Sequence, residues 1–108
     1  MKYRNKPCTV GAEKYRSKRE RDAHIQLLLM QKAGLISDLR REVPFVLAPP
    51  VKFSGDKRAK PALRYVADFT AMRNGAFCVF DAKGVRTAAY KIKRHLMMTV
   101  HGIEVQEL

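Results

Sequence analysis

The sequence predicts one α/β domain in which helices flank a central mixed sheet. Three observations support this prediction. A capped amphipathic helix is expected at 17–33, an Asn-Gly pair at 74–75 joins two runs rich in β-branched and aromatic residues, and a second helix precedes a short strand at 103–106. The expected order is therefore helix, three strands, helix and strand. Because the last strand is reached through a helix, we expect it to run parallel to the strand before that helix.

A strong excess of positive charge indicates the class of partner. The chain of 108 residues has 22 Lys and Arg against 10 Asp and Glu, a net charge of +12. Such a field favours polyanions, with nucleic acid as the first candidate and an anionic membrane as the second. We expect no membrane span and no signal peptide, because no apolar run approaches about 20 residues. Cys8 and Cys78 fit neither a disulfide framework nor a zinc-ligand spacing, so we expect a reducing cytoplasm.

Residues 1–15 are expected to form a mobile or loosely packed basic arm. They contain Pro7, Gly11 and several basic side chains, and they have no sustained periodicity. Such an arm could bind phosphate groups, or it could be a disordered tail that improves solubility. The sequence leaves both interpretations open.

The first helix is expected to begin at Ser17 and to end at Gly34. Ser17 followed three residues later by Glu20 is the capping-box pattern, and glycine favours a helix C-cap. One face carries Glu20, Ala23, Leu27 and Met30, with His24 and Gln31 at its edge. Glu20 therefore points toward the surface on which the helix packs, although it could serve only as a cap. His24 is interpreted as a packed or hydrogen-bonded histidine, and the exposed pair Ile25 and Leu29 would allow a homodimer contact.

The middle of the chain is expected to contain a short strand and a loop. Residues 35–41 are interpreted as a connector and 43–48 as a strand, which Pro49-Pro50 breaks and 51–53 resumes. Residues 54–61 form a turn or loop with three basic side chains. This loop could contact a nucleic-acid backbone, or it could be a solvated hairpin tip.

The Asn-Gly pair at 74–75 predicts a β-hairpin with a type I′ turn over residues 63–84. If these two residues form the loop, Arg73 pairs with Ala76. The same register places Asp68 opposite Asp81, on the same face and about 4.5–5.5 Å apart at Cβ. An unrelated turn signal thus brings two carboxylates together.

Two opposed aspartates in apolar strands indicate a cation site. Like charges opposed on neighbouring strands are destabilising, whereas a divalent cation requires converging oxygen ligands. Lys83 lies two residues after Asp81 and adds an ammonium group on the same face. The alternative is that Asp81 only begins a turn at Gly84. Cys78 lies on the opposite face and is expected to be a buried thiol.

The second helix is expected to begin at Thr87 and to reach about Val100. Its expected buried stripe consists of Ala89, Ile92, Leu96 and Val100. Its basic flank consists of Tyr90, Lys93 and Arg94. Such a flank is usually solvated, but here it begins directly after the proposed cation site, so Lys93 is a candidate for gripping phosphate. Gly102 is expected to end the helix.

Four segments together resemble a known nuclease superfamily. They are Ser17-Lys18-Arg19-Glu20, Arg64-Tyr65-Val66-Ala67-Asp68-Phe69, Asp81-Ala82-Lys83-Gly84 and Tyr90-Lys91-Ile92-Lys93. Their order and spacing resemble the PD-(D/E)XK nuclease superfamily, and more narrowly a family of small phage-encoded proteins related to Holliday junction resolvases. The resemblance covers residues 15–108. It implies a restriction-endonuclease-like core in the order αβββαβ, here residues 16–108, preceded by the arm at 1–15.

The resemblance assigns roles to four residues. It implies that Asp68 and Asp81 ligate Mg²⁺, which Mn²⁺ could replace, and that Glu20 assists metal binding. Lys83 would orient the attacking water or stabilise charge on the phosphate. One departure is that the second acidic position is Asp81 rather than the commoner glutamate. The side chains expected to contact nucleic acid are Lys18, Arg19, Arg58, Lys60, Arg64, Arg86, Tyr90, Lys93 and Arg94.

The resemblance and the charge together lead us to expect a Mg²⁺-dependent DNA endonuclease. Cleavage is expected to be structure-selective, of the branched-DNA or Holliday junction type, in phage recombination or replication in the host cytoplasm. The alternative is a non-catalytic basic nucleic-acid-binding accessory protein with a nuclease-like fold. A third reading is an inhibitor or adaptor that binds a host protein through the basic surface.

Overall fold

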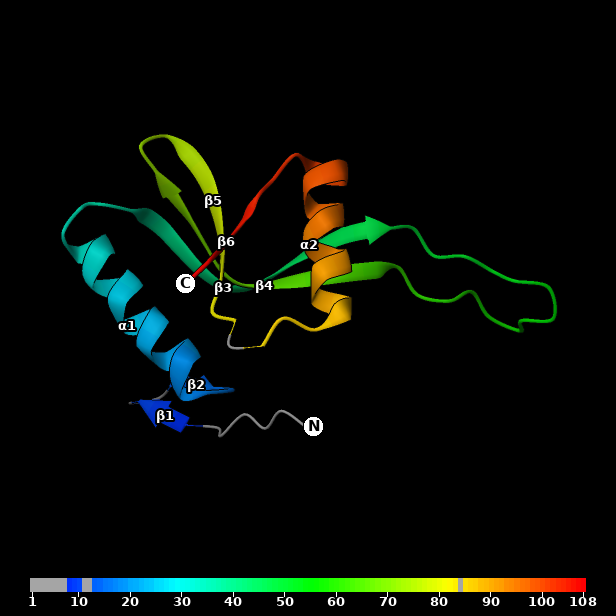
Figure 1. The fold of residues 1–108 in the computed structure, drawn as a ribbon, viewed down its shortest axis with the longest axis horizontal. Coiled ribbons are helices and arrows are strands. Elements are labelled where there is room, and N and C mark those ends of the chain that lie inside the picture. Colours follow the sequence, from blue (N-terminus) through cyan, green and yellow to red (C-terminus); the bar gives the residue numbers. More distant parts are fainter. Residues whose placement is uncertain (1–7, 11–12, 84) are drawn as a thin grey trace.

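The computed structural model describes residues 8–10, 13–83 and 85–108, and a four-stranded mixed sheet forms their centre (Figure 1). The sheet order is β3-β4-β5-β6. The strands are β3 (Ser37–Ala48), β4 (Leu63–Arg73), β5 (Ala76–Asp81) and β6 (Val105–Glu107). Strands β3, β4 and β5 are antiparallel, whereas β6 runs parallel to β5. The prediction of an α/β domain whose last strand is parallel is confirmed.

Two helices, α1 (Lys18–Lys32) and α2 (Ala88–His101), pack on opposite faces of the β5–β6 part of the sheet, which passes between them (Figure 1). Neighbouring residues of a strand point to opposite faces. Accordingly, Val79 belongs to the buried cluster that contains α2 residues, and Phe80 belongs to the cluster that contains α1 residues. In the described part of the chain, neither helix is long and apolar enough to cross a membrane.

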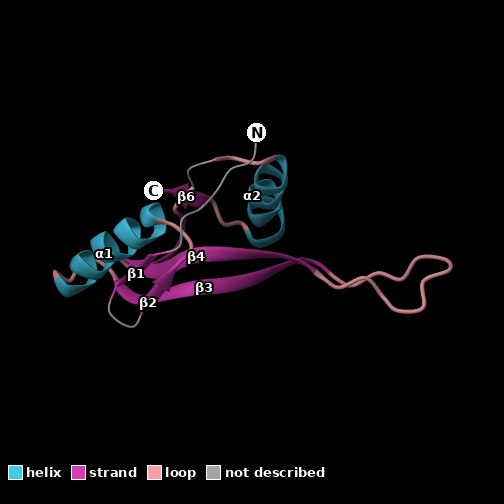
Figure 2. Cartoon of the chain, turned by 90° about the horizontal axis from the view of Figure 1, so that it is seen from below, coloured by secondary structure: helices cyan, strands magenta, loops and turns pink. Residues whose placement is uncertain are grey.

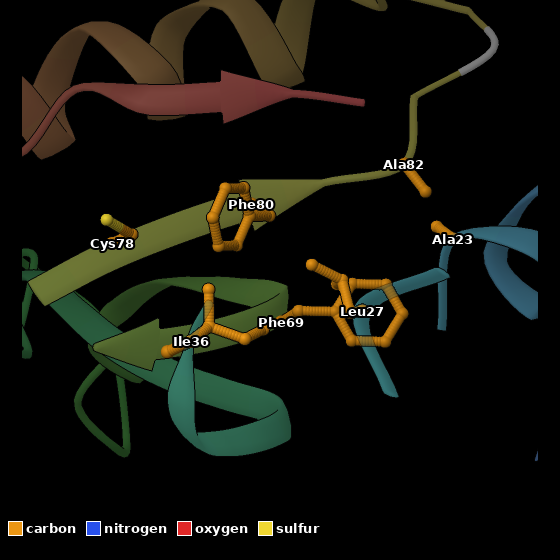
Figure 3. Close-up of a cluster of buried hydrophobic side chains, with 8 residues drawn as sticks. Ala23, Leu27, Ile36, Phe69, Cys78, Phe80 and Ala82 are labelled. Atoms are coloured by element: carbon orange, nitrogen blue, oxygen red, sulfur yellow. The ribbon is translucent and has the colours of Figure 1, made fainter. Parts of the chain in front are cut away.

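Helix α1 forms as the sequence predicts. The Ser17 hydroxyl accepts a hydrogen bond from the Glu20 N–H, and Gly34 follows the helix with a left-handed φ of 80°. Ala23 and Leu27 pack against Phe69, Phe80 and other apolar side chains of the sheet (Figure 3). The helix thereby fixes the position of Glu20, which lies on the same buried face.

Helix α2 also begins and ends where expected, but its buried face is different. Thr87 caps its N-terminus, and Gly102 ends it with a left-handed φ of 67°. Tyr90 and Met97 are buried, whereas the expected core residues Ile92 and Val100 are largely exposed.

There is a physical reason why α2 buries Tyr90 and Met97 instead of Ile92 and Val100. The helix carries two apolar stripes, and the larger side chains of Tyr90 and Met97 fill the space above the sheet. Lys93 and Arg94 are half-buried on that side, which long aliphatic stems permit. The stripe of Ala89, Ile92 and Val100 therefore lies outside, and the basic flank faces inward.

The β4–β5 hairpin has the predicted register. Asn74 and Gly75 have φ angles of 52° and 77°, so both occupy the left-handed region that a type I′ turn requires. Pairing runs from Arg73 with Ala76 to Phe69 with Phe80. Because the next positions are 68 and 81, the two aspartates lie at the same level, where β5 ends.

Strand β3 is longer than predicted, since it already begins at Ser37 in the stretch expected to be a connector. Asp38 and Glu42 have positive φ angles of 52° and 53°, which are uncommon for residues other than glycine. Burial alternates along the strand, but a charged residue, Arg41, occupies one of the half-buried positions, and this hides the alternation in the sequence. Glu42 lies between residues paired with Ala67 and Phe69 on β4. Ala67 packs in the cluster that contains α2 residues, and Phe69 packs in the cluster that contains α1 residues. The side chains of alternate β4 residues therefore switch from the α2 face of the sheet to the α1 face at Asp68.

Beyond the sheet, residues 49–62 form a long projection that points away from both helices (Figures 1 and 2). Pro49-Pro50 ends β3 as predicted. The strand expected at 51–53 is reduced to a single bridge between Val51 and Lys60. We call residues 49–62 the β-arm.

Part of the expected N-terminal arm has regular structure. Strands β1 (Cys8–Val10) and β2 (Glu13–Tyr15) form a small antiparallel sheet, so the expectation of a loosely packed arm is wrong for these residues. Tyr15 is buried, and its hydroxyl lies 2.8 Å from Nδ1 of His24, which is a hydrogen-bonded histidine as predicted. Residues 1–7 and 11–12 of the expected arm lie outside the described residues.

Candidate functional site

The Asp81 carboxylate is buried at the end of β5, with only 1% of the residue exposed. The Tyr65 hydroxyl donates a 2.6 Å hydrogen bond to its Oδ2. Its Oδ1 has no hydrogen-bond partner among the described residues, and the Nζ of Lys83 lies 3.6 Å away. A buried, unpaired carboxylate oxygen is unfavourable unless a cation reaches it.

The surroundings of Asp81 disfavour its charge. The pKa of Asp81 is raised from 3.8 to about 6. Burial is the largest cause and the negative charge of Asp68 adds to it, whereas the hydrogen bond from Tyr65 and the charge of Lys83 act in the opposite direction. Burial and the hydrogen bond to Asp81 raise the pKa of Tyr65. The hydroxyl therefore stays protonated and keeps donating to Asp81.

Asp68 lies beside Asp81 and is also buried, with 7% of the residue exposed. Its Oδ2 accepts a 2.9 Å hydrogen bond from the N–H of Ala82, the residue after Asp81. Its Oδ1 accepts a 2.9 Å hydrogen bond from Nη2 of Arg16. The hairpin thus brings two carboxylates together, and an arginine partly neutralises one of them.

Glu20 is buried on α1 and is held by two arginines. Its Oε1 accepts a 2.9 Å hydrogen bond from Arg41, and its Oε2 lies 3.4 Å from Nε of Arg16. Arg16 therefore bridges Glu20 and Asp68. Among the described residues, no group of three or more His, Cys, Asp or Glu could hold a metal ion. Asp68 and Asp81 are the two carboxylates that lie together where β5 ends.

The sequence reasoning missed Arg16 and Arg41. Arg16 precedes Glu20 by four residues, a spacing typical of ion pairs, so a local signal for it existed. Arg41 left no such signal, because it lies in the bent part of β3. Its guanidinium lies 4.5 Å from the centre of the Tyr15 ring, which holds the Glu20 partner in place.

A cleft of about 300 Å³ lies next to the carboxylate pair. It is lined by Arg16, Tyr65, Val66, Lys83, Thr87, Ala89, Tyr90 and Lys93. The ammonium of Lys83 lies 4.9 Å from the centre of the Tyr90 ring, which orients it by a cation–π contact. Three basic side chains around one cleft suit a phosphate group. Lys93 lines the cleft because α2 buries the face that carries Tyr90 and Met97 rather than the face expected from the sequence.

The other predicted nucleic-acid contacts are dispersed. Arg86 forms a bidentate pair with Glu107 at 2.7–3.0 Å, and Arg94 donates to the carbonyl of Val105 at 3.3 Å. Both guanidinium groups are thus directed toward β6. The remaining side chains are exposed on α1, β4 and the β-arm, namely Lys18, Arg19, Arg64, Arg58 and Lys60.

The site has features that fit a divalent cation. Asp81 offers a buried Oδ1 that accepts no hydrogen bond in the described structure, and Asp68 offers a second carboxylate close enough to raise the Asp81 pKa. Hard oxygen ligands of this kind are the ones that Mg²⁺ prefers. A cation bound to Oδ1 of Asp68 would lie close to the Arg16 guanidinium, which already donates to this oxygen.

Comparison with known proteins gives one match. A family model described as "Protein of unknown function (DUF1064)" matches residues 1–106. This range includes both strands of the hairpin that carries Asp68 and Asp81. No curated protein and no solved structure matches the chain.

Proposed function

We propose that this chain, which belongs to the DUF1064 family of proteins of unknown function, is a divalent-metal-dependent endonuclease that hydrolyses phosphodiester bonds in DNA. One observation carries the proposal. Two buried carboxylates, one with an oxygen that accepts no hydrogen bond in the described structure, lie beside a cleft lined by three basic side chains. A positive field over the whole chain favours a polyanionic substrate.

Asp68 and Asp81 are the residues that would hold Mg²⁺ or Mn²⁺. When bound, such an ion polarises a phosphoryl oxygen and lowers the pKa of a water ligand. Lys83 lies 3.6 Å from Asp81 and lines the cleft, so its ammonium can stabilise negative charge that develops on a phosphate there. Tyr65 positions Asp81 by its hydrogen bond, and Lys93 and Arg16 attract the DNA backbone.

The finer part of the proposal comes from the resemblance to PD-(D/E)XK nucleases of the Holliday junction type. It includes structure-selective cleavage of branched DNA in phage recombination or replication, in the host cytoplasm. It also includes a homodimer, for which Ile25, Leu28 and Leu29 expose apolar side chains on α1. Light scattering on a Leu29→Glu variant would show fewer dimers than the wild type if this contact forms.

A cleavage assay tests the proposal. Wild type, Asp81→Asn and Asp68→Asn are incubated with four-way, flap and linear DNA in Mg²⁺, Mn²⁺ or EDTA. We expect metal-dependent cleavage by the wild type and none by either variant. Asp22→Asn is the matched control, because Asp22 is exposed and pairs only with its neighbour Arg21 in the described contacts. Equal cleavage by wild type and Asp81→Asn, or no cleavage of any DNA, contradicts the nuclease.

One observation favours a second candidate, the non-catalytic nucleic-acid-binding protein. Arg16 already pairs with Asp68 Oδ1 and Lys83 lies 3.6 Å from Asp81 Oδ1, so the two carboxylates could serve only to hold these basic side chains in place. This alternative predicts tight, salt-sensitive DNA or RNA binding that Asp68→Asn and Asp81→Asn leave unchanged, with no cleavage by the wild type.

A further inference from the structure

The β-arm is an ordered ribbon rather than a loose loop. Val51 and Lys60 exchange both backbone hydrogen bonds near its base. At the turn, the Asp56 carboxylate accepts from the Phe53 N–H at 3.1 Å, and the Asp56 N–H donates back to the Phe53 carbonyl at 3.0 Å. Gly55 has a left-handed φ of 86°, which a side chain would strain.

The β-arm is basic and extends away from the domain (Figures 1 and 2). Its charged residues are Lys52, Asp56, Lys57, Arg58 and Lys60. Asp56 is partly neutralised by Lys60, whose Nζ lies 3.8 Å away. The remaining positive charge favours a phosphate backbone over an apolar or basic protein surface.

Phe53 stands at the turn of this ribbon with 63% of the residue exposed, more than any other aromatic residue in the described part of the chain. Its backbone N–H and C=O are both held by Asp56, so the ring is presented from a fixed position. The described residues give it no place in either buried cluster. A large, oriented apolar ring among cations suits a partner that has both phosphates and flat apolar faces.

We propose that the β-arm binds nucleic acid at a site with an unstacked base, and that Phe53 stacks on that base. The faces of bases inside a continuous duplex are covered by their neighbours, so the ring finds a partner only at a junction, flap, gap or single strand. This inference rests on the proposed function, in which DNA is the substrate, and it identifies an unstacked base as the feature of the DNA that the protein recognises.

The structure also gives an approximate distance between the proposed unstacked nucleobase and the two carboxylates. Eight residues separate Lys60, at the base of the β-arm, from Asp68 on β4. At about 3.3 Å per residue this span is roughly 26 Å. Phe53 lies beyond this point, toward the turn of the β-arm, so at about 3.4 Å per step the unstacked base would lie more than about eight nucleotide steps from Asp68.

The test measures the affinity of the full chain, in EDTA, for a flap DNA and for a continuous duplex of the same length. Fluorescence anisotropy gives the affinities, and 2-aminopurine placed at the unpaired position reports stacking. Phe53→Ala is expected to weaken flap binding by about 5- to 150-fold, the usual effect of losing one base–aromatic stack, and to change duplex binding by less than about twofold. Phe53→Trp should keep both the affinity and the quenching of 2-aminopurine.

Ile92→Ala is the matched control, because Ile92 is 60% exposed and lies on the outer face of α2. It should bind both DNAs like the wild type. The inference is overturned if Phe53→Ala binds the flap as tightly as the wild type, or if it loses the same affinity for the flap and for the duplex. In either case the nuclease proposal stands if metal-dependent cleavage persists. A wild type that binds no nucleic acid overturns both and indicates a protein partner for the β-arm.

Discussion

Nη2 of Arg16 lies 2.9 Å from Oδ1 of Asp68, so a guanidinium pairs directly with one of the two carboxylates of the proposed metal site. The same guanidinium lies 3.4 Å from Glu20 through its Nε. Arg16 thus links the buried glutamate of α1 to the acidic pair of the hairpin. In the metal-free protein this link reduces repulsion between carboxylates, and it competes with any cation that approaches Asp68.

Replacing Arg16 should therefore tighten metal binding. Arg16→Gln removes both the competing hydrogen bond and a nearby positive charge, so we expect Mn²⁺ to bind about 5- to 10-fold more tightly, as for a partly exposed ion pair of about 1 kcal/mol. Calorimetric titration of Mn²⁺ into the DNA-free protein measures this effect. Arg16→Lys keeps the charge and should show a smaller gain. Weaker Mn²⁺ binding by Arg16→Gln would show that the guanidinium supports the site.

Removing the charge of Asp81 should stabilise the metal-free fold. Folding raises the pKa of this group from 3.8 to about 6, so the folded protein binds the proton more tightly than the unfolded chain does. Its contribution to the free energy of unfolding is therefore fully present below about pH 4 and is lost as pH rises through about 6. Asp81→Asn should then exceed the wild type at pH 8 by at most about 3 kcal/mol, and this advantage should shrink at pH 5.

Urea unfolding in EDTA at both pH values tests this expectation, with Asp22→Asn as the exposed control. If Asp81→Asn were less stable than the wild type at pH 8, the carboxylate would be a structural element rather than a strained ligand. A gain of equal size at both pH values would also contradict the titration of Asp81 near pH 6.

A divalent ion should raise the thermal stability of the wild type. An ion that binds only the folded state at 100 times its Kd adds about 2.7 kcal/mol to the free energy of unfolding. Thermal denaturation with increasing Mn²⁺ should therefore raise the Tm of the wild type but not of Asp68→Asn or Asp81→Asn. Equal shifts in all three proteins would place the ion elsewhere.

The hairpin could be predicted because its signals are local. Asn74-Gly75 determines both the turn and the register, and the register alone brings position 68 to the level of 81. The buried face of α1 was equally accessible, since Ala23 and Leu27 repeat at helical spacing, although Ile25, Leu28 and Leu29 leave apolar side chains exposed elsewhere on the helix.

The remaining errors come from contacts between distant segments. In α2, two apolar stripes compete, and only packing against the sheet decides that Tyr90 and Met97 are buried. The pairing of Arg41 with Glu20 joins residues 21 positions apart across a bent strand. No local pattern reports such a contact. The site therefore combines the carboxylate pair with an arginine network that also holds Glu20.

Lys93 and Arg86 should differ in their contributions to DNA binding, although both were predicted to contact phosphate. Lys93 lines the cleft beside the carboxylates, whereas Arg86 is held by Glu107, whose pKa it lowers to about 2. Lys93→Ala should weaken binding of every DNA and reduce the slope of log K against log salt by about 1, because one phosphate contact is lost. Arg86→Ala should leave that slope unchanged. Binding titrations between 50 and 300 mM salt measure both slopes. An equal reduction in the two variants would mean that Arg86 leaves Glu107 to bind DNA, and that the loop between β5 and α2 rearranges around the substrate.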